Sequence, residues 1–164
     1  PPLRCFLAGD GSLRAALAAD LHRLGLETPV RMLGQLEDPR TLLWALDVFV
    51  MPSLHEGLGV AALEAMACGL PAIVTASGGL GETVEDGRSG VKVPPADAGA
   101  LAQAILRLAS NPQARATMGA AARAIVAERF GMDAMARRTV ELYRTCIAKT
   151  GRNDAKRVNE RCGV

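Results

Sequence analysis

The chain has 164 residues, which suits one domain with at most a short appendage. Hydrophobic residues make up 49% of it and aromatic residues 3%, which excludes a disordered chain and means that Ala, Leu, Val and Met must build the core. Residues 151–164 carry four positive and two negative side chains, so residues 1–150 hold 15 of each sign and are neutral. A neutral body argues against nucleic-acid binding, which needs a basic face.

The first half of the chain alternates short apolar runs with helical patterns, separated by glycine and proline. In chain order, the expected elements are a strand over 4–8, a helix over 13–24, a strand over 30–33, a helix from Asp38, a strand over 46–51 and a helix over 58–68. Gly69 ends the last of these helices.

The second half begins in the same way and then becomes helical throughout. The expected elements are a strand over 72–75, a short helix after Gly79, a strand over 91–93 and helices over 98–110, 112–129 and 132–148. Asp97 and Asn111 are expected to cap two of these helices. The polar tail 149–164 is expected to be loose, which leaves 1–148 as the domain.

Strands that alternate with helices, and that are apolar along their whole length, predict an α/β, Rossmann-like fold. In such a fold one parallel sheet is flanked by helices on both faces. Ligands bind beyond the carboxyl ends of the strands of such sheets. The loops of interest are therefore 9–12, 33–37, 52–57 and 76–81.

The four cysteines are far apart and form no Cys-x-x-Cys pair: Cys5, Cys68, Cys146 and Cys162. This spacing predicts neither a metal site nor a disulfide framework, and we expect reduced thiols in a cytoplasmic protein. The longest charge-free stretch, 65–81, is broken by glycine and proline and predicts no membrane span. The chain opens at Pro1-Pro2 and enters a strand at once, so we expect it to be part of a longer protein.

One carboxylate stands on an otherwise apolar helix. Between Gly57 and Gly81 the only charged side chain is that of Glu64. A carboxylate in such surroundings is costly unless it meets a partner. A solvated helix face would carry charges at the neighbouring helical positions, whereas Ala, Val and Cys occupy them here. We therefore expect Glu64 to meet a ligand and not bulk solvent.

The spacing of this segment indicates what the ligand is. Glu64 lies seven positions after Gly57, so on a helix both would share a face with a rise of about 10 Å between them. Free N–H groups at a helix start bind phosphate, and Gly57 and Gly59 let a ligand approach the backbone closely. A carboxylate accepts hydrogen bonds from two vicinal ribose hydroxyls. The pattern predicts a nucleoside diphosphate, with Glu56 facing the group attached to the far phosphate.

Glu56 and Glu64, with seven residues between them, resemble the Glu-x7-Glu motif of retaining glycosyltransferases of the GT-B fold, and the surrounding sequence is similar to family 4, also called group 1. The other matching residues are Gly9-Asp10-Gly11, Val30, Gly34, Pro52-Ser53, Gly57, Gly59, 63–66, Cys68-Gly69, Pro71, Ser77-Gly78-Gly79, Glu82 and Asp86-Gly87. The resemblance covers about residues 4–146. It departs at Gly81, where the family often has Pro, and at Gly131, where Ser or Thr often caps the last helix.

The resemblance implies that the chain is the C-terminal half of a GT-B enzyme, whose N-terminal acceptor domain lies outside it together with the basic residues that hold the phosphates. It implies that Glu64 binds the ribose hydroxyls and that Glu56, the expected catalytic residue, hydrogen-bonds the donor sugar. The backbone of Gly57, Leu58 and Gly59 would bind the diphosphate and the sugar. The base would be bound by Met32, Leu33 and Gly34.

The leading hypothesis is transfer of a sugar, with retention, from a nucleotide diphosphate sugar to an acceptor, with no metal or other cofactor. Two alternatives stay open: a sugar-nucleotide epimerase of similar fold, and a catalytically silent module that binds nucleotide sugars. Abundant Ala and Arg suggest a bacterial source and hence polysaccharide or lipopolysaccharide assembly at the inner face of the membrane. The basic tail would allow only a weak peripheral contact with that membrane.

Overall fold

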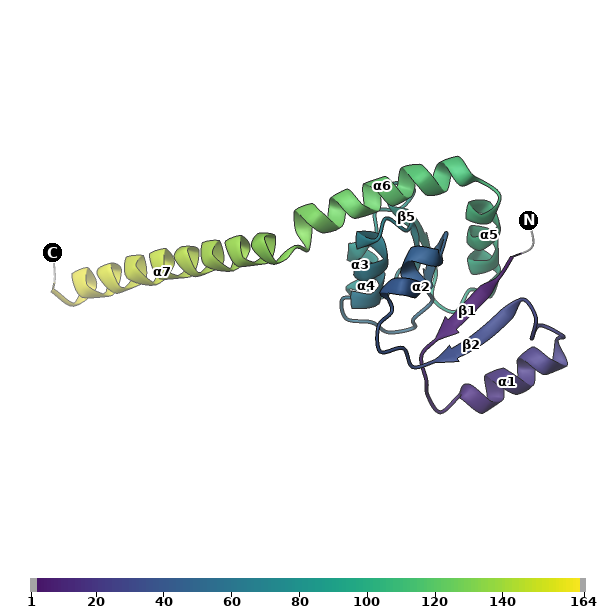
Figure 1. The fold of residues 1–164 in the computed structure, drawn as a ribbon. Helices are drawn as coiled ribbons and strands as arrows, with labels where there is room; N and C mark the ends of the chain where they lie inside the picture. Colours follow the sequence, from purple (N-terminus) through teal and green to yellow (C-terminus); the bar gives the residue numbers. More distant parts are fainter. Residues whose placement is uncertain (1–2, 163–164) are drawn as a thin grey trace.

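The computed structural model describes the backbone of residues 3–162 and the side chains of residues 3–149. Parallel strands flanked by helices make up the body of the molecule, which confirms the α/β class (Figure 1). The strands are β1 (Cys5–Ala8), β2 (Val30–Gly34), β3 (Phe49–Met51), β4 (Ala72–Thr75) and β5 (Gly90–Val93). The helices are α1 (Arg14–Arg23), α2 (Arg40–Ala45), α3 (Val60–Ala67), α4 (Leu80–Thr83), α5 (Ala98–Ala109), α6 (Pro112–Arg129) and α7 (Met132–Cys162).

The strands form two sheets, where the sequence predicts one. β1 pairs with β2, and β3, β4 and β5 pair in that order, with every pair parallel. No strand in 3–162 joins β1 to β3. Sequence periodicity identifies strands but carries no information on which strands are neighbours, so it could not reveal this division.

The core is built around β4, whose four residues are all buried. Successive side chains of a strand point to opposite faces. Accordingly, Val74 packs with Met66 and Ile125 on the face covered by α3 and α6, and Ile73 packs with Leu108 on the face covered by α5. The three-stranded sheet is thus covered on both faces, as predicted. By contrast, all of β1 is exposed and α1 has no buried residue.

The caps predicted at Asp97 and Asn111 are confirmed, whereas the N-cap of α2 is Pro39 and not Asp38, where the helix was expected to start. The side chain of Asp97 accepts a hydrogen bond from the Ala100 N–H at 2.8 Å, and that of Asn111 accepts one from the Ala114 N–H at 2.9 Å. These bonds satisfy N–H groups that have no partner inside the helix, which fixes where α5 and α6 begin.

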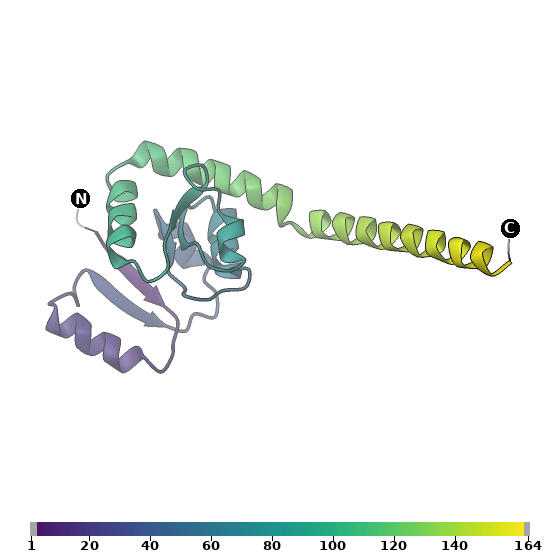
Figure 2. The same ribbon diagram turned by 180° about the vertical axis from the view of Figure 1, so that it is seen from behind.

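α7 extends away from the body of the molecule (Figures 1 and 2). Its helical backbone continues to Cys162, whereas the polar composition after residue 148 suggests that the helix ends there. Arg, Lys and Glu are good helix formers, so a polar composition does not by itself mark a helix end. None of the helices in 3–162 combines the length and the apolar character needed to cross a bilayer.

The close approach of α6 to the end of α3 can be tested by substitution of a glycine in α6. A Cβ on Gly119 of α6 would overlap the carbonyl oxygen of Gly69, whereas a Cβ on Gly99 of α5 would make an ordinary contact of 3.4 Å with Asp97. Overpacking outweighs the better helix propensity of alanine, so Gly119→Ala should lower the free energy of unfolding by about 1–2 kcal/mol.

Gly99→Ala is the matched control and should leave that free energy unchanged or raise it by up to about 1 kcal/mol. Urea unfolding followed by circular dichroism measures both. Equal effects of the two substitutions would show that the Gly69–Gly119 contact does not hold α6 in place.

Candidate functional site

The loop 52–59 follows β3 and leads into α3, and its middle is held by backbone contacts. Gly78 and Gly79 lie so close to it that a Cβ on Gly78 would overlap the carbonyl oxygen of Glu56, and one on Gly79 that of Gly57. The side chain of Glu56 is half-buried, and its Oε1 accepts a hydrogen bond from the Gly57 N–H at 3.0 Å. Glycine at 78 and 79 therefore allows the two loops to touch.

The start of the same loop is tied to the end of β4. The carbonyl oxygen of Ser53 accepts hydrogen bonds from Thr75 Oγ1 at 2.5 Å and from Ser77 Oγ at 3.1 Å. Only 3% of Thr75 is exposed, so its bond is shielded from water. Sequence reasoning missed Thr75; a hydroxyl at the end of an otherwise aliphatic strand is the signal that could have indicated it.

α3 begins two residues later than predicted. Gly59 caps the helix in a left-handed conformation, with φ +73°, and a Cβ there would overlap Leu80. The Ala62 and Leu63 N–H groups donate to the Gly59 carbonyl at 2.9 and 3.2 Å. A left-handed residue cannot lie inside an α-helix, so Gly57 is not on the same helix as Glu64 and the rise of about 10 Å between them does not apply.

α3 has one buried and one exposed side. Ala62, Leu63, Ala65 and Met66 face the core. Glu64 is exposed, which corrects the expectation that its surroundings exclude solvent, and no hydrogen bond or ion pair within the described residues engages its carboxylate. The rest of this side is apolar: Ala61 and Ala67 are exposed, and Val60 is 60% exposed. Glu64 is therefore a single carboxylate on an exposed apolar surface.

The residues predicted to bind a base lie at the end of β2. Gly34 is buried with φ +74°, and its carbonyl oxygen accepts a hydrogen bond from the Gly9 N–H at 2.7 Å. A Cβ on Gly34 would lie 3.1 Å from Nη1 of Arg14, which itself pairs with Asp10 at 3.3 Å. The carboxyl ends of β1 and β2 thus meet at Gly34, beside a guanidinium group that sequence reasoning missed.

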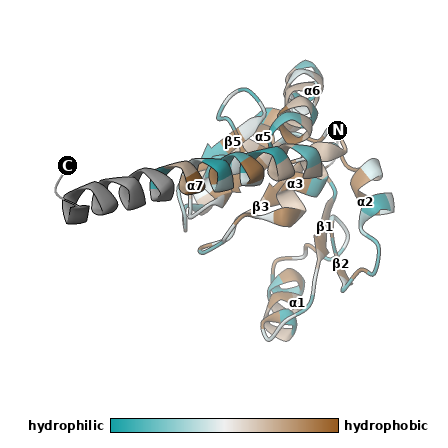
Figure 3. Cartoon of the chain, turned by 90° about the vertical axis from the view of Figure 1, so that its left-hand side faces the viewer, coloured by the Kyte–Doolittle hydropathy of each residue, from teal (hydrophilic) through white to brown (hydrophobic). Residues whose placement is uncertain are grey.

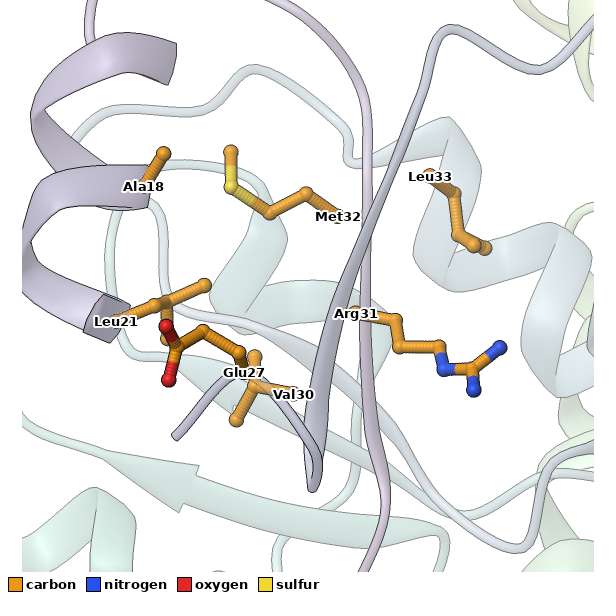
Figure 4. A pocket seen from close by; sticks show the side chains of 7 residues that line it. All are labelled: Ala18, Leu21, Glu27, Val30, Arg31, Met32 and Leu33. Carbon is orange, nitrogen blue, oxygen red and sulfur yellow. The ribbon is translucent and has the colours of Figure 1, made fainter. Parts of the chain in front are cut away.

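A shallow pocket of about 460 Å³ lies between α1 and β2 (Figure 4). Met32 points from β2 toward α1, and Leu33 and Arg31 lie on the other side of the strand. No residue of the loop 52–59 or of α3 lines this pocket. Met32 and Leu33, two of the residues predicted to bind the base, line it, and we place the rest of the candidate site at the 52–59 loop and α3.

Apolar colouring extends over parts of β1, β3 and α3 in the view along the side of the molecule (Figure 3).

Among the described residues, no three His, Cys, Asp or Glu side chains gather in a way that could hold a metal ion. The polar groups at the start of α3 are its backbone N–H groups and the carboxylates of Glu56 and Glu64.

Comparison with known proteins shows which family this chain resembles. Residues 2–111 match the family described as glycosyl transferases group 1. The D-inositol 3-phosphate glycosyltransferase of Kribbella flavida is 37% identical over 141 residues, which cover 84% of this chain and 33% of that protein. The chain thus spans about a third of the length of this curated relative.

Solved structures show the same fold. HepE of Anabaena, solved in complex with UDP, superposes with a TM-score of 0.81 at 31% identity over 88% of this chain and 42% of that one. The C-terminal domain of LpcC, a group 1 glycosyl transferase of Francisella tularensis, superposes with a TM-score of 0.67 at 26% identity over 73% of this chain and 63% of that one.

The contact between the two loops can be tested with two alanine substitutions. Gly79 has an ordinary φ of −68°, so the only cost of Gly79→Ala is the overlap with the Gly57 carbonyl. Because both sides of that contact are backbone, we expect a loss of about 2–3 kcal/mol in the free energy of unfolding, and displaced NMR resonances for Glu56 and Gly57.

Gly81→Ala is the matched control, because a Cβ there would lie 3.6 Å from the nearest atom, of Ala76. It should change neither the free energy of unfolding by more than about 0.5 kcal/mol nor the Glu56 resonances. If Gly79→Ala behaves like Gly81→Ala, the loop is held by something other than this contact.

Proposed function

The chain belongs to the group 1 glycosyl transferases, and we propose that it is the part of such an enzyme that binds the donor, a nucleotide diphosphate sugar. HepE of Anabaena has been solved with UDP and with UDP-glucose, and it shares the fold of this chain at TM-scores of 0.81 and 0.80. Relatives with named activities are transferases, which favours transfer over epimerisation.

The observation that carries the proposal is the carboxylate of Glu64, which has no partner within the described residues. It lies four residues after Val60, the first residue of α3, and so about one turn and about 6 Å along the same side of the helix. An anionic group at the start of α3 and a hydroxyl-bearing group beside Glu64 would thus be neighbours. A nucleoside diphosphate offers both, with its phosphates at the helix start and its ribose at Glu64.

The start of α3 suits a diphosphate because its first N–H groups have no acceptors within the helix. The positive end of the helix dipole adds to their attraction for an anion. Gly59 brings the chain into the helix without a side chain of its own, so a phosphate oxygen can approach the backbone of Gly57, Leu58 and Gly59. In this proposal the same groups stabilise the negative charge that leaves with the diphosphate during transfer.

Glu56 is assigned to the donor sugar. Contacts with Gly78 and Gly79 hold the backbone around Glu56. One carboxylate oxygen of Glu56, Oε1, accepts a hydrogen bond from the Gly57 N–H. The other oxygen is available to accept a hydrogen bond from a sugar hydroxyl. We assign the base to the end of β2, at Met32, Leu33 and Gly34, with transfer by retention and without a metal ion.

The proposal predicts that UDP-, GDP- or ADP-sugars raise the melting temperature of residues 1–164 and that the effect depends on Glu64. Loss of hydrogen bonds to a charged group costs about 1.5–3 kcal/mol, so Glu64→Ala should weaken binding about tenfold to a hundredfold. Glu128→Ala is the control, because Glu128 is also an exposed helical carboxylate with no hydrogen-bond or ion-pair partner within the described residues.

Thermal shift and isothermal titration calorimetry measure the effect. The proposal assigns only donor binding to residues 1–164, so it predicts no detectable sugar transfer by these residues alone. Two results would contradict the proposal. One is that no nucleotide sugar raises the melting temperature, and the other is that Glu64→Ala binds as tightly as Glu128→Ala.

A further inference from the structure

The guanidinium group of Arg14 lies against the carboxyl end of β2. Arg14 is the first residue of α1, and its Nη1 is 3.1 Å from the place that a Cβ on Gly34 would occupy. Gly34 is buried and has φ +74°, so a side chain there would be strained as well as crowded. Glycine at position 34 therefore leaves room for the guanidinium beside the backbone of the strand.

Arg14 also lies at one end of the pocket between α1 and β2. It precedes Ala18, which lines that pocket, by four residues, so the two side chains share a face of the helix. Met32 points from β2 into the same space (Figure 4). Gly34 is two residues further along the strand and faces the same side. Arg14 is thus found where the pocket reaches the carboxyl end of β2, and parallel sheets bind ligands at that end.

Most hydrogen-bond donors of this guanidinium are unused. Asp10 Oδ2 accepts a hydrogen bond from Arg14 Nη1 at 3.3 Å and is the only partner of the group among residues 3–149. The other oxygen of Asp10, Oδ1, accepts a hydrogen bond from the Gly11 N–H at 2.8 Å. Asp10 therefore orients the guanidinium, while 45% of the arginine side chain stays exposed. A planar group with free donors in a set orientation is suited to ligand recognition.

We propose that Arg14 contacts the base of the nucleotide and selects a base that carries a carbonyl oxygen, guanine or uracil, over adenine. The inference rests on the donor-binding role proposed above, which assigns the base to Met32, Leu33 and Gly34. Arginine only donates hydrogen bonds. Guanine offers it two adjacent acceptors, O6 and N7, whereas adenine presents an amino group, itself a donor, beside N7. Uracil has carbonyl oxygens, but no two acceptors are adjacent in its ring.

A phosphate is the other acceptor that arginine commonly binds. Two observations favour the base. No residue of the 52–59 loop or of α3, to which the diphosphate is assigned, lines the pocket at whose end Arg14 lies. The carboxylate of Asp10 is next to the guanidinium, and its negative charge opposes a phosphate at this position but not a neutral base.

Isothermal titration calorimetry of the chain with GDP, UDP and ADP tests the selection. Arg14→Met keeps an unbranched side chain of good helix propensity and removes every donor. It should weaken GDP binding about tenfold to a hundredfold and UDP binding about threefold to tenfold, and it should change ADP binding by less than about twofold. Arg14→Lys keeps the charge but not the planar fork, so it should abolish the preference for GDP over UDP.

Arg23→Met is the matched control. Arg23 is at the opposite end of α1, is also exposed, and also pairs with a single carboxylate, that of Asp20, at 2.8 Å. Its substitution should leave the affinity for all three nucleotides within about twofold of that of the unchanged chain. Equal melting temperatures of the Arg14→Met and Arg23→Met variants would show that the helix itself is intact in both.

Three results would overturn the inference. Equal weakening of all three nucleotides by Arg14→Met would mean that Arg14 acts through its charge or on a phosphate. Unchanged binding of all three would mean that Arg14 only supports the 9–12 loop. ADP binding as tight as GDP binding in the unchanged chain would mean that no such selection exists. Each of these leaves donor binding and its dependence on Glu64 in place, whereas a failure of all three nucleotides to bind would overturn both proposals.

Discussion

The backbone contact between Gly78-Gly79 and Glu56-Gly57 is the constraint on which the rest of the site depends. Two loops that follow neighbouring parallel strands meet there with no side chain between them. The hydrogen bonds from Thr75 and Ser77 to the Ser53 carbonyl hold the same two loops together at their base. Because the 52–59 loop leads directly into α3, fixing the loop also fixes the first turn of that helix.

The two sides of α3 have different roles. Its buried side packs against β4, α4 and α6, which anchors the helix in the core. Its exposed side is apolar except for Glu64, an arrangement that a helix facing only water would not favour. A charge on an exposed apolar surface, one turn from a helix start, is suited to a ligand that is partly apolar, partly hydroxylated and anionic at one end.

Sequence patterns predicted the order of strands and helices, the caps at Asp97 and Asn111, and the loops that meet at the candidate site. They missed features that depend on contacts between distant residues. The start of α3 depends on the left-handed Gly59 against Leu80, and the role of Thr75 depends on the Ser53 carbonyl. The division into two sheets is a matter of strand pairing, which periodicity does not report.

The central claim is that the start of α3 and Glu64 form the donor site, and NMR titration of residues 1–164 with a nucleotide diphosphate sugar tests it most directly. Weak binding is sufficient, because amide resonances report contacts residue by residue. We predict that the largest shifts fall on the amides of Gly57–59, Val60, Ala61 and Glu64. Shifts confined to the pocket between α1 and β2, with the amides from 57 to 64 unchanged, would contradict the account.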